Sequence, residues 1–272
     1  MQRREWFELH DHRLYPRFLR DLMTDALGAI WNRIHCYRVI VPHLRAAMKD
    51  AGTSRIVDLC SGGGGPWLRL QQEFLSGEGL PIHISLTDKY PNHEAFKRAS
   101  AVAGVHFYLD SVDATQVPAQ LSGFRTIFTS FHHFGPKDAR AMLADAVARH
   151  QGIAVFETPR RDVRTILATC AVPLLSWYVT PGIRPFRWSR LVWTYLLPVV
   201  PFTLVVDGLL SCLRAYSLND LRELTDGLGG EDYRWEMGEE RSWGVGITYL
   251  IGRPWKGNRA EEEPAVSAYS QQ

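Results

Sequence analysis

The stretch IVDLCSGGGGPW, residues 56–67, joins a short apolar run containing one aspartate to four consecutive glycines. Glycine allows positive φ angles and close approach of the backbone to a ligand, so the run predicts a binding turn after a strand. A phosphate-binding P-loop needs a lysine followed by Ser or Thr, and no lysine follows these glycines. The dinucleotide pattern GxGxxG fits poorly, because Trp67 or Leu68 stands where the third glycine permits close packing of helix on strand. The turn therefore predicts a ligand that needs close backbone contact but no phosphate cradle.

The composition excludes several classes of protein. The chain has 272 residues, 46% hydrophobic and 22% charged, which suits one elaborated domain. The formal net charge of +2 and the scattered Lys and Arg residues argue against a nucleic-acid partner. The four cysteines form no CxxC pair and indicate reduced thiols. We therefore expect a cytoplasmic protein without a disulfide framework or a metal site; the oligomeric state stays open.

Short apolar runs alternate with segments of helical periodicity downstream of the first fifty residues. Strands are expected at 56–59, 82–88, 105–110, 124–131, 152–158, 233–240 and 243–254. Helices are expected at 18–34, in much of 37–50, and at 66–75, 93–102, 136–150 and 217–229. This alternation predicts a doubly wound α/β fold with a mostly parallel seven-stranded sheet, whose last two strands form an antiparallel pair.

Two regions interrupt the alternation, namely N-terminal helices within 1–50 and an aromatic-rich, helical insertion at 158–215. The insertion contains the uncharged run 191–206, which is 16 residues long and holds Pro198 and Pro201. A spanning helix needs about 20 apolar residues without such interruptions. We expect a buried or interfacial segment there, with peripheral membrane contact left open.

The segment 56–65, IVDLCSGGGG, resembles the first motif of class I S-adenosylmethionine-dependent methyltransferases of the small-molecule type. That family has the pattern D/E-x-G-x-G-x-G, in which Asp58 matches the acidic position and Cys60 replaces the first glycine, while Gly62 and Gly64 match the other two. The sulfonium cofactor carries no phosphate, which fits a turn without lysine. The resemblance covers about half of the chain and implies a Rossmann-like fold that binds S-adenosylmethionine.

The resemblance extends to the ends of the next strands. It implies that Asp88 accepts hydrogen bonds from the ribose hydroxyls, that Tyr90 lies against the adenosine, and that Asp113 meets the adenine amino group, with Asp110 as the alternative. The full set of implied cofactor-binding residues is Asp58, Cys60, Ser61, Gly62, Gly64, Asp88, Lys89, Tyr90, Asp113, Ala114 and Ser130.

Two histidine clusters are candidates for chemistry. His132 and His133 end the fourth strand, and either is a candidate catalytic base, because the pKa of histidine lies near neutrality. The alternative is that one histidine shapes the cofactor pocket and the other faces solvent. The HDH triplet at residues 10–12 is a candidate for orienting a substrate or a metal, but adjacent residues rarely point the same way, so we expect a solvated N-terminal segment.

These observations predict three units: a helical cap at 1–50, a cofactor-binding core at 51–257 whose insertion covers the substrate, and a polar tail at 258–272. The expected activity is in-line methyl transfer to a small hydrophobic or aromatic acceptor, whose methylated atom stays open. The absence of NPPY or DPPY after the fourth strand argues against a nucleic-acid amino methyltransferase. The alternatives are a non-catalytic or membrane-associated binding protein on the same fold, and a cofactor-dependent cyclase.

Overall fold

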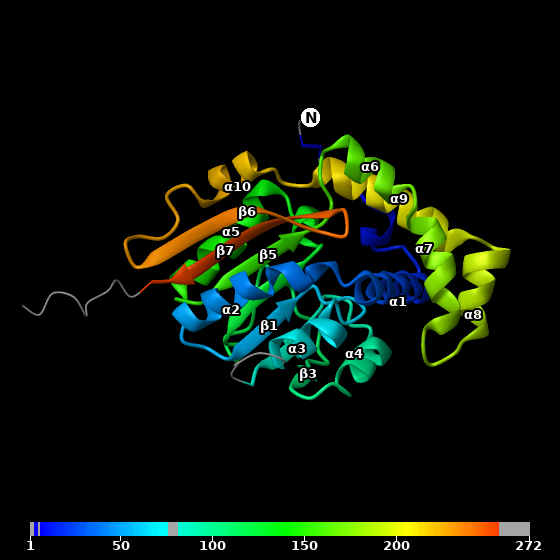
Figure 1. The fold of residues 1–272 in the computed structure, drawn as a ribbon, viewed down its shortest axis with the longest axis horizontal. Helices are drawn as coiled ribbons and strands as arrows, with labels where there is room; N and C mark the ends of the chain where they lie inside the picture. Colours follow the sequence, from blue (N-terminus) through cyan, green and yellow to red (C-terminus); the bar gives the residue numbers. More distant parts are fainter. Residues whose placement is uncertain (1–2, 5, 76–80, 256–272) are drawn as a thin grey trace, which may run out of the picture.

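The computed structural model describes residues 3–4, 6–75 and 81–255, and the expected polar tail at 258–272 lies outside them. Within the described residues, seven strands form one sheet in the order β3-β2-β1-β4-β5-β7-β6 (Figure 1). The strands are β1 Arg55–Leu59, β2 His83–Leu86, β3 Val105–Phe107, β4 Phe124–Phe128, β5 Ile153–Glu157, β6 Tyr233–Ser242 and β7 Val245–Pro254. The predicted seven-stranded α/β architecture is confirmed.

The sheet is mixed rather than mostly parallel. Strands β1 to β5 pair in parallel, whereas β7 pairs antiparallel with both β5 and β6. The cause is the two-residue turn Trp243–Gly244, in which both residues have positive φ angles of 50° and 82°. Turns of this kind match the twist of a hairpin and reverse the chain at once, so β7 returns between β5 and β6.

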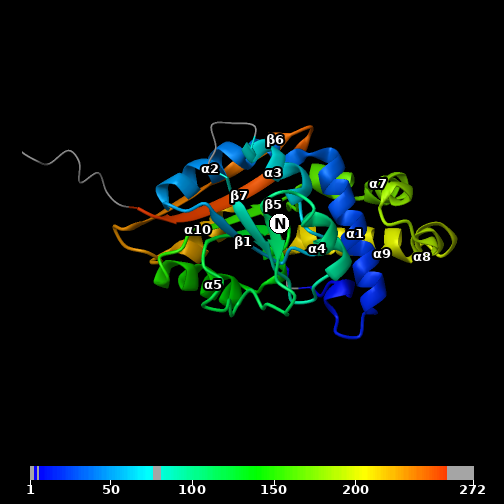
Figure 2. The same ribbon diagram turned by 90° about the horizontal axis from the view of Figure 1, so that it is seen from below.

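Helices cover both faces of the sheet. Their bounds are α1 Arg17–Ile34, α2 Val41–Asp50, α3 Trp67–Leu75, α4 His93–Ala99, α5 Pro136–Ala148, α6 Val163–Thr169, α7 Val172–Val179, α8 Trp188–Leu191, α9 Val199–Arg214 and α10 Leu218–Thr225. Figure 2 shows α2 and α3 on one side of the sheet and α5 and α10 on the other. Every residue of β4 and β5 is buried between these layers, as expected for central parallel strands.

A third apolar cluster joins the N-terminal helix to the insertion. Leu19 and Met23 of α1 pack with Val200 and Leu204 of α9, at the end of the molecule where α7 and α8 also lie (Figure 1). The run 191–206 does not form one helix: a π-helical turn at Val192–Leu196 ends before Pro198, and the following helix is bent away by 66°. Proline cannot continue the preceding helix, which explains the break.

Candidate functional site

The glycine turn after β1 is organised by the buried carboxylate of Asp58. The Ser61 hydroxyl donates to its Oδ2 at 2.6 Å, and the Thr126 hydroxyl of β4 donates to its Oδ1 at 2.6 Å. Burial raises the pKa of Asp58 to about 6, although both hydroxyls oppose that shift. Asp58 is therefore occupied in holding the turn, and it acts on a ligand only through the shape of the backbone.

The turn itself has left-handed backbone where the family pattern has glycine. Cys60, in place of the first glycine, adopts φ +57°, a conformation that costs an L-residue about 1 kcal/mol. Gly62 has φ +51°, and its N–H donates to Oδ2 of Asp88 at 2.7 Å. Burial and the neighbouring carboxylates raise the pKa of the Cys60 thiol, which keeps this residue neutral.

The remaining glycines allow helices to pack closely on the turn. A Cβ on Gly63 would lie 2.3 Å from the carbonyl oxygen of Thr24 in α1. This clash is with the backbone, so it could not be relieved by moving a side chain. A Cβ on Gly64 would lie 3.3 Å from Ala99 of α4. Trp67 then fills the space between α3 and the sheet, with its ring 5.5 Å from that of Phe128. Part of the glycine run therefore allows close helix packing. Trp67 stands at the position of the third glycine of a dinucleotide-binding turn, where glycine lets the helix pack closely on the strand.

Asp88 lies at the end of β2 beside the turn. Its two carboxylate oxygens accept the backbone N–H groups of Gly62 and Tyr90, each at 2.7 Å. Burial raises the pKa of Asp88, and the two N–H donors and the nearby Arg20 oppose that effect. A carboxylate has about four acceptor positions, so the two that remain suit a vicinal diol.

The loop after β3 returns to the same edge. Asp113 accepts the Lys89 ammonium at 2.7 Å and the Thr115 hydroxyl at 2.7 Å. Burial raises the pKa of Asp113, but these hydrogen bonds outweigh it and lower the pKa to about 2. The buried Ala114 follows it, whereas the alternative residue Asp110 is exposed. The ends of β1, β2 and β3 thus bring the implied cofactor residues together.

The turn after β4 is held by a residue that the sequence reasoning did not single out. The Glu157 carboxylate, at the end of β5, accepts the N–H groups of Ser130 and Phe131 at 2.9 and 2.7 Å. Its other oxygen lies 2.5 Å from Nδ1 of the buried His132. With Nδ1 donating to Glu157, Nε2 of His132 carries a free lone pair. The position of Glu157 at a strand end was the only sequence signal for this pair.

The N-terminal segment covers that histidine. Glu8 is buried and its Oε1 lies 3.6 Å from Nε2 of His132, and neither atom has a hydrogen-bond partner among the described residues. Burial raises the pKa of Glu8 against the opposing influence of the nearby His133, His10 and Arg214 charges. Two polar atoms that face each other in a buried site without hydrogen bonds favour a place where a proton or a polar group is exchanged.

The prediction of a solvated HDH segment is wrong. Asp207 of α9 accepts the backbone N–H groups of Leu9 and His10 at 2.7 and 3.1 Å, and its carboxylate also lies 2.7 Å from Nδ1 of His10. Asp11 lies 2.8 Å from Nδ1 of His133. The polar partners are far away in the sequence, which is why the local pattern gave no indication of this docking.

Three overlapping groups of these side chains have possible metal-ligand atoms within 4.8 Å of one another, for example Glu8, His132 and His133. A fixed cation already lies among them, because Nη1 of Arg214 is 3.2 Å from Asp11 and 3.6 Å from Glu8. Arg214 also donates to the carbonyl oxygens of His132 and His133. The arrangement fits a charge-compensated hydrogen-bond network better than a cation site.

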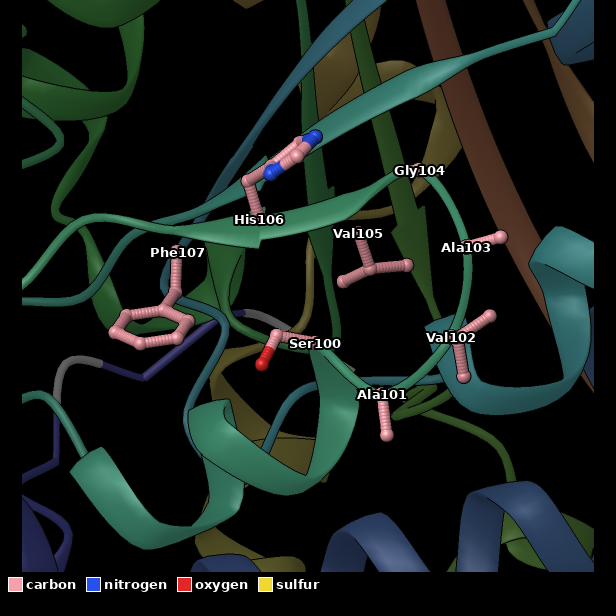
Figure 3. Close-up of a pocket in the computed structure, with 8 residues that line it drawn as sticks. All are labelled: Ser100, Ala101, Val102, Ala103, Gly104, Val105, His106 and Phe107. Atoms are coloured by element: carbon pink, nitrogen blue, oxygen red, sulfur yellow. The ribbon is translucent and has the colours of Figure 1, made fainter.

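A separate hollow lies at the β3 edge of the sheet. Figure 3 shows its lining, residues 100–107 at the end of α4 and in β3, which surround a cavity of about 470 Å³. Its side chains are mostly small and apolar, and no carboxylate lines it. The hollow does not include any of the candidate cofactor or histidine residues.

No protein-family model matches the chain, and no curated protein matches it either. Several solved structures are similar to it at low sequence identity. Mitomycin 7-O-methyltransferase MmcR is 14% identical with a TM-score of 0.47, covering 80% of this chain and 54% of the other. Human N-acetylserotonin methyltransferase in complex with S-adenosylmethionine is 14% identical with a TM-score of 0.44, covering 81% and 53%.

LepI in complex with S-adenosylmethionine is 14% identical with a TM-score of 0.43, covering 74% of this chain and 43% of the other. The chain therefore spans about half the length of the solved structures that it matches. The strand order and the antiparallel β6–β7 hairpin of the chain itself agree with the doubly wound α/β fold that the glycine turn implied.

Proposed function

We propose that the protein is an S-adenosylmethionine-dependent methyltransferase, cytoplasmic, acting on a small apolar or aromatic acceptor. The observation that supports the proposal most directly is the convergence of three segments at the carboxyl ends of parallel strands. The glycine turn, the Asp88 carboxylate and the Asp113 loop are joined there by the hydrogen bond from Gly62 to Asp88 and the ion pair from Lys89 to Asp113. Ligands of open α/β sheets bind at this edge.

The residues present fit the cofactor. The backbone of residues 60–64 gives the close approach that its adenosyl and methionine parts need, and Asp88 has acceptor positions left for its ribose. We assign Asp113 and Ala114 to the adenine and Ser130 to the methionine end, as the resemblance implies. When bound, S-adenosylmethionine supplies an activated methyl group for in-line displacement.

His132 is the better candidate for the base. Its Nε2 is free to accept a proton from an acceptor hydroxyl, and Glu157 at Nδ1 would stabilise the resulting imidazolium. His133 is engaged with Asp11 through Nδ1, so we assign it a structural role. A base of this kind favours a hydroxyl acceptor, because an alcohol must lose its proton during methyl transfer.

The N-terminal residues and the insertion would enclose the acceptor. The Glu8 carboxyl faces Nε2 of His132 at 3.6 Å, so an acceptor that approaches this nitrogen would require the N-terminal segment to shift. Residues 1–50 and 158–215 then act as a cap and a cover over the core, which excludes water from the reacting atoms. The many apolar side chains of the insertion favour a hydrophobic acceptor.

Calorimetry with S-adenosylmethionine tests the proposal. The wild type is expected to bind, and Asp88→Ala is expected to weaken binding at least tenfold, because the variant removes the carboxylate that we assign to the ribose. The matched control is Asp138→Ala, an exposed residue in the first turn of α5, which is expected to bind as the wild type does. A wild type that does not bind would overturn the proposal, and binding without methylated product in an acceptor screen would favour the non-catalytic or cyclase alternatives.

A further inference from the structure

The outer surface of the insertion is built from large apolar side chains. Six leucine or aromatic side chains among them are each at least 61% exposed: Leu167, Leu174, Tyr178, Trp188, Leu196 and Phe202. They come from α6 to α9 and the turn between α8 and α9, which lie together at one end of the molecule (Figures 1 and 2). We call these six the insertion surface. Monomeric soluble proteins rarely expose so many large apolar groups in one region.

The composition of the helices points to lipid. The helical run Val163–Gly182 is long and apolar enough to cross a membrane, yet only 17% of its apolar window is buried in the protein. The core helix of a soluble protein with this composition would be mostly buried. The second apolar element, Trp188–Leu196 followed by α9, passes the same test only as a pair bent by 66°.

Anchors on the protein side keep these helices at a surface rather than across a bilayer. Arg190 after Trp188 is buried and donates to Asp25 of α1 at 2.6 Å. The last turns of α9 place Asp207 against the N-terminal segment and Arg214 against the His132 turn. A spanning orientation would have to pull these charges out of the protein. Exposed Trp and Tyr beside apolar helices are typical of segments that lie at the membrane–water interface.

The charge of the insertion selects the kind of membrane. Between Val163 and Val206 the sequence has four arginines and no aspartate, glutamate or lysine. Arg190 is neutralised by Asp25, and Arg187 pairs with Glu94. Arg164 and Arg184 are exposed and have no ion pair within the described part of the chain. Uncompensated arginines next to an apolar surface attract anionic lipid headgroups.

We propose that the insertion surface docks this protein onto an anionic lipid bilayer, with α6 to α9 lying in the interface. Apolar side chains would enter the acyl boundary while Arg164 and Arg184 meet the headgroups. The proposal does not depend on methyl transfer, because docking requires only the outer side of the insertion.

Vesicle flotation tests the docking. The full chain is mixed with vesicles of phosphatidylcholine alone or with a third of phosphatidylglycerol, without cofactor. We expect the wild type to float with the anionic vesicles and at least tenfold less with the neutral ones. The triple variant Leu174→Ser, Trp188→Ser, Leu196→Ser is expected to lose at least tenfold in binding, and Arg164→Gln with Arg184→Gln to lose most of the preference for anionic lipid.

The matched control is Trp243→Ser, in the β6–β7 turn outside the insertion, whose side chain is 90% exposed and which should float as the wild type does. Circular dichroism and calorimetry with S-adenosylmethionine confirm that each variant is folded. The proposal is overturned if the wild type stays in the bottom fraction of the gradient with both vesicle types. It is also overturned if the triple variant floats as the wild type does. A concentration-dependent dimer on size exclusion that the triple variant abolishes would assign the surface to a second copy of the chain and likewise overturn it.

Discussion

The carboxyl end of the sheet and the outer side of the insertion satisfy their side chains in opposite ways. At the sheet edge, polar side chains that are buried or half-buried have specific partners, as in the pairs His132–Glu157 and His10–Asp207. On the insertion, large apolar groups face outward without such partners, and its buried charges Arg190, Asp207 and Arg214 are each tied to other parts of the chain. The first region depends on geometry within the chain, whereas the second is suited to contact something outside it. Substitutions at the contact between the insertion and α1, and at polar residues of the sheet edge, should separate these two roles.

The largest expected effect is at the link between the two regions. Arg190→Met leaves Asp25 buried with one guanidinium fewer and removes the donors to the carbonyls of Ile183 and Pro185. Breaking a buried pair typically costs about 3–5 kcal/mol, so we expect a loss of that size in the free energy of unfolding by urea. The exposed Arg184→Met should change it by less than about 0.5 kcal/mol. Equal stabilities for the two variants would mean that the insertion is not anchored through Arg190.

The next effect concerns the paired histidine at the sheet edge. His132→Gln removes the base while keeping a polar side chain, so the methyl-transfer rate should fall about 100-fold or more, which corresponds to about 3 kcal/mol. Calorimetry should show an unchanged affinity for S-adenosylmethionine, so that the loss lies in the rate of transfer and not in cofactor binding. His133→Gln is the control and should lose much less activity, because that residue is engaged with Asp11. A larger loss in His133→Gln would reverse the assignment.

The fold could be predicted well because its signals are local. Alternating apolar runs and helical periodicity placed the strands and the main helices, and the resemblance of 56–65 placed the glycine turn at the correct strand end. Three strands were each predicted three residues too long, since β2 covers only His83–Leu86, β3 ends at Phe107 and β4 at Phe128. Thr129 turns the chain out of the sheet with φ +47°, a conformation that its residue type does not signal.

The catalytic surroundings could not be predicted in the same way. Glu8 and Asp207 reach the histidines from segments that are distant in the sequence, and no local pattern reports which distant carboxylate faces a given ring. Glu157 could have been found as an acidic residue at the end of a central strand. The sequence did not indicate that the run Val163–Gly182 is exposed, because the run 191–206 is the more apolar of the two and because exposure depends on tertiary packing.

A smaller effect is expected from the buried carboxyl that organises the glycine turn. Burial raises the pKa of Asp58 to about 6, above its unfolded value, so the native state favours the protonated form. The contribution is fully present below about pH 4 and is lost as the pH rises through about 6. Between pH 4 and pH 6 the free energy of unfolding should fall by about 2 kcal/mol from this group.

Asp58→Asn removes that titration, so urea unfolding of the variant should lack this fall relative to the wild type. The control Asp110→Asn, at an exposed position, should keep it. Parallel pH profiles for the wild type and Asp58→Asn would show that Asp58 is ionised throughout this range, and the turn would then be held by a charged carboxylate.

The smallest effect lies at the exposed rim of the polar region. Lys89 and Asp113 form an ion pair at 2.7 Å in which both side chains remain solvent-accessible. Exposed pairs contribute about 0.2–1 kcal/mol and are screened by salt, so Lys89→Met should lower the free energy of unfolding by no more than that, and less at high salt. The pKa of Asp113, lowered to about 2 against burial by Lys89 and Thr115, should rise in the variant when followed by NMR. Lys97→Met, an exposed lysine of α4, is the control and should leave that pKa unchanged. The contribution of this ion pair to stability should be lost as the pH falls below about 4, because Asp113 then becomes protonated. If Lys89→Met is as stable as the wild type at every pH and salt concentration, the ion pair orders the loop without stabilising the fold.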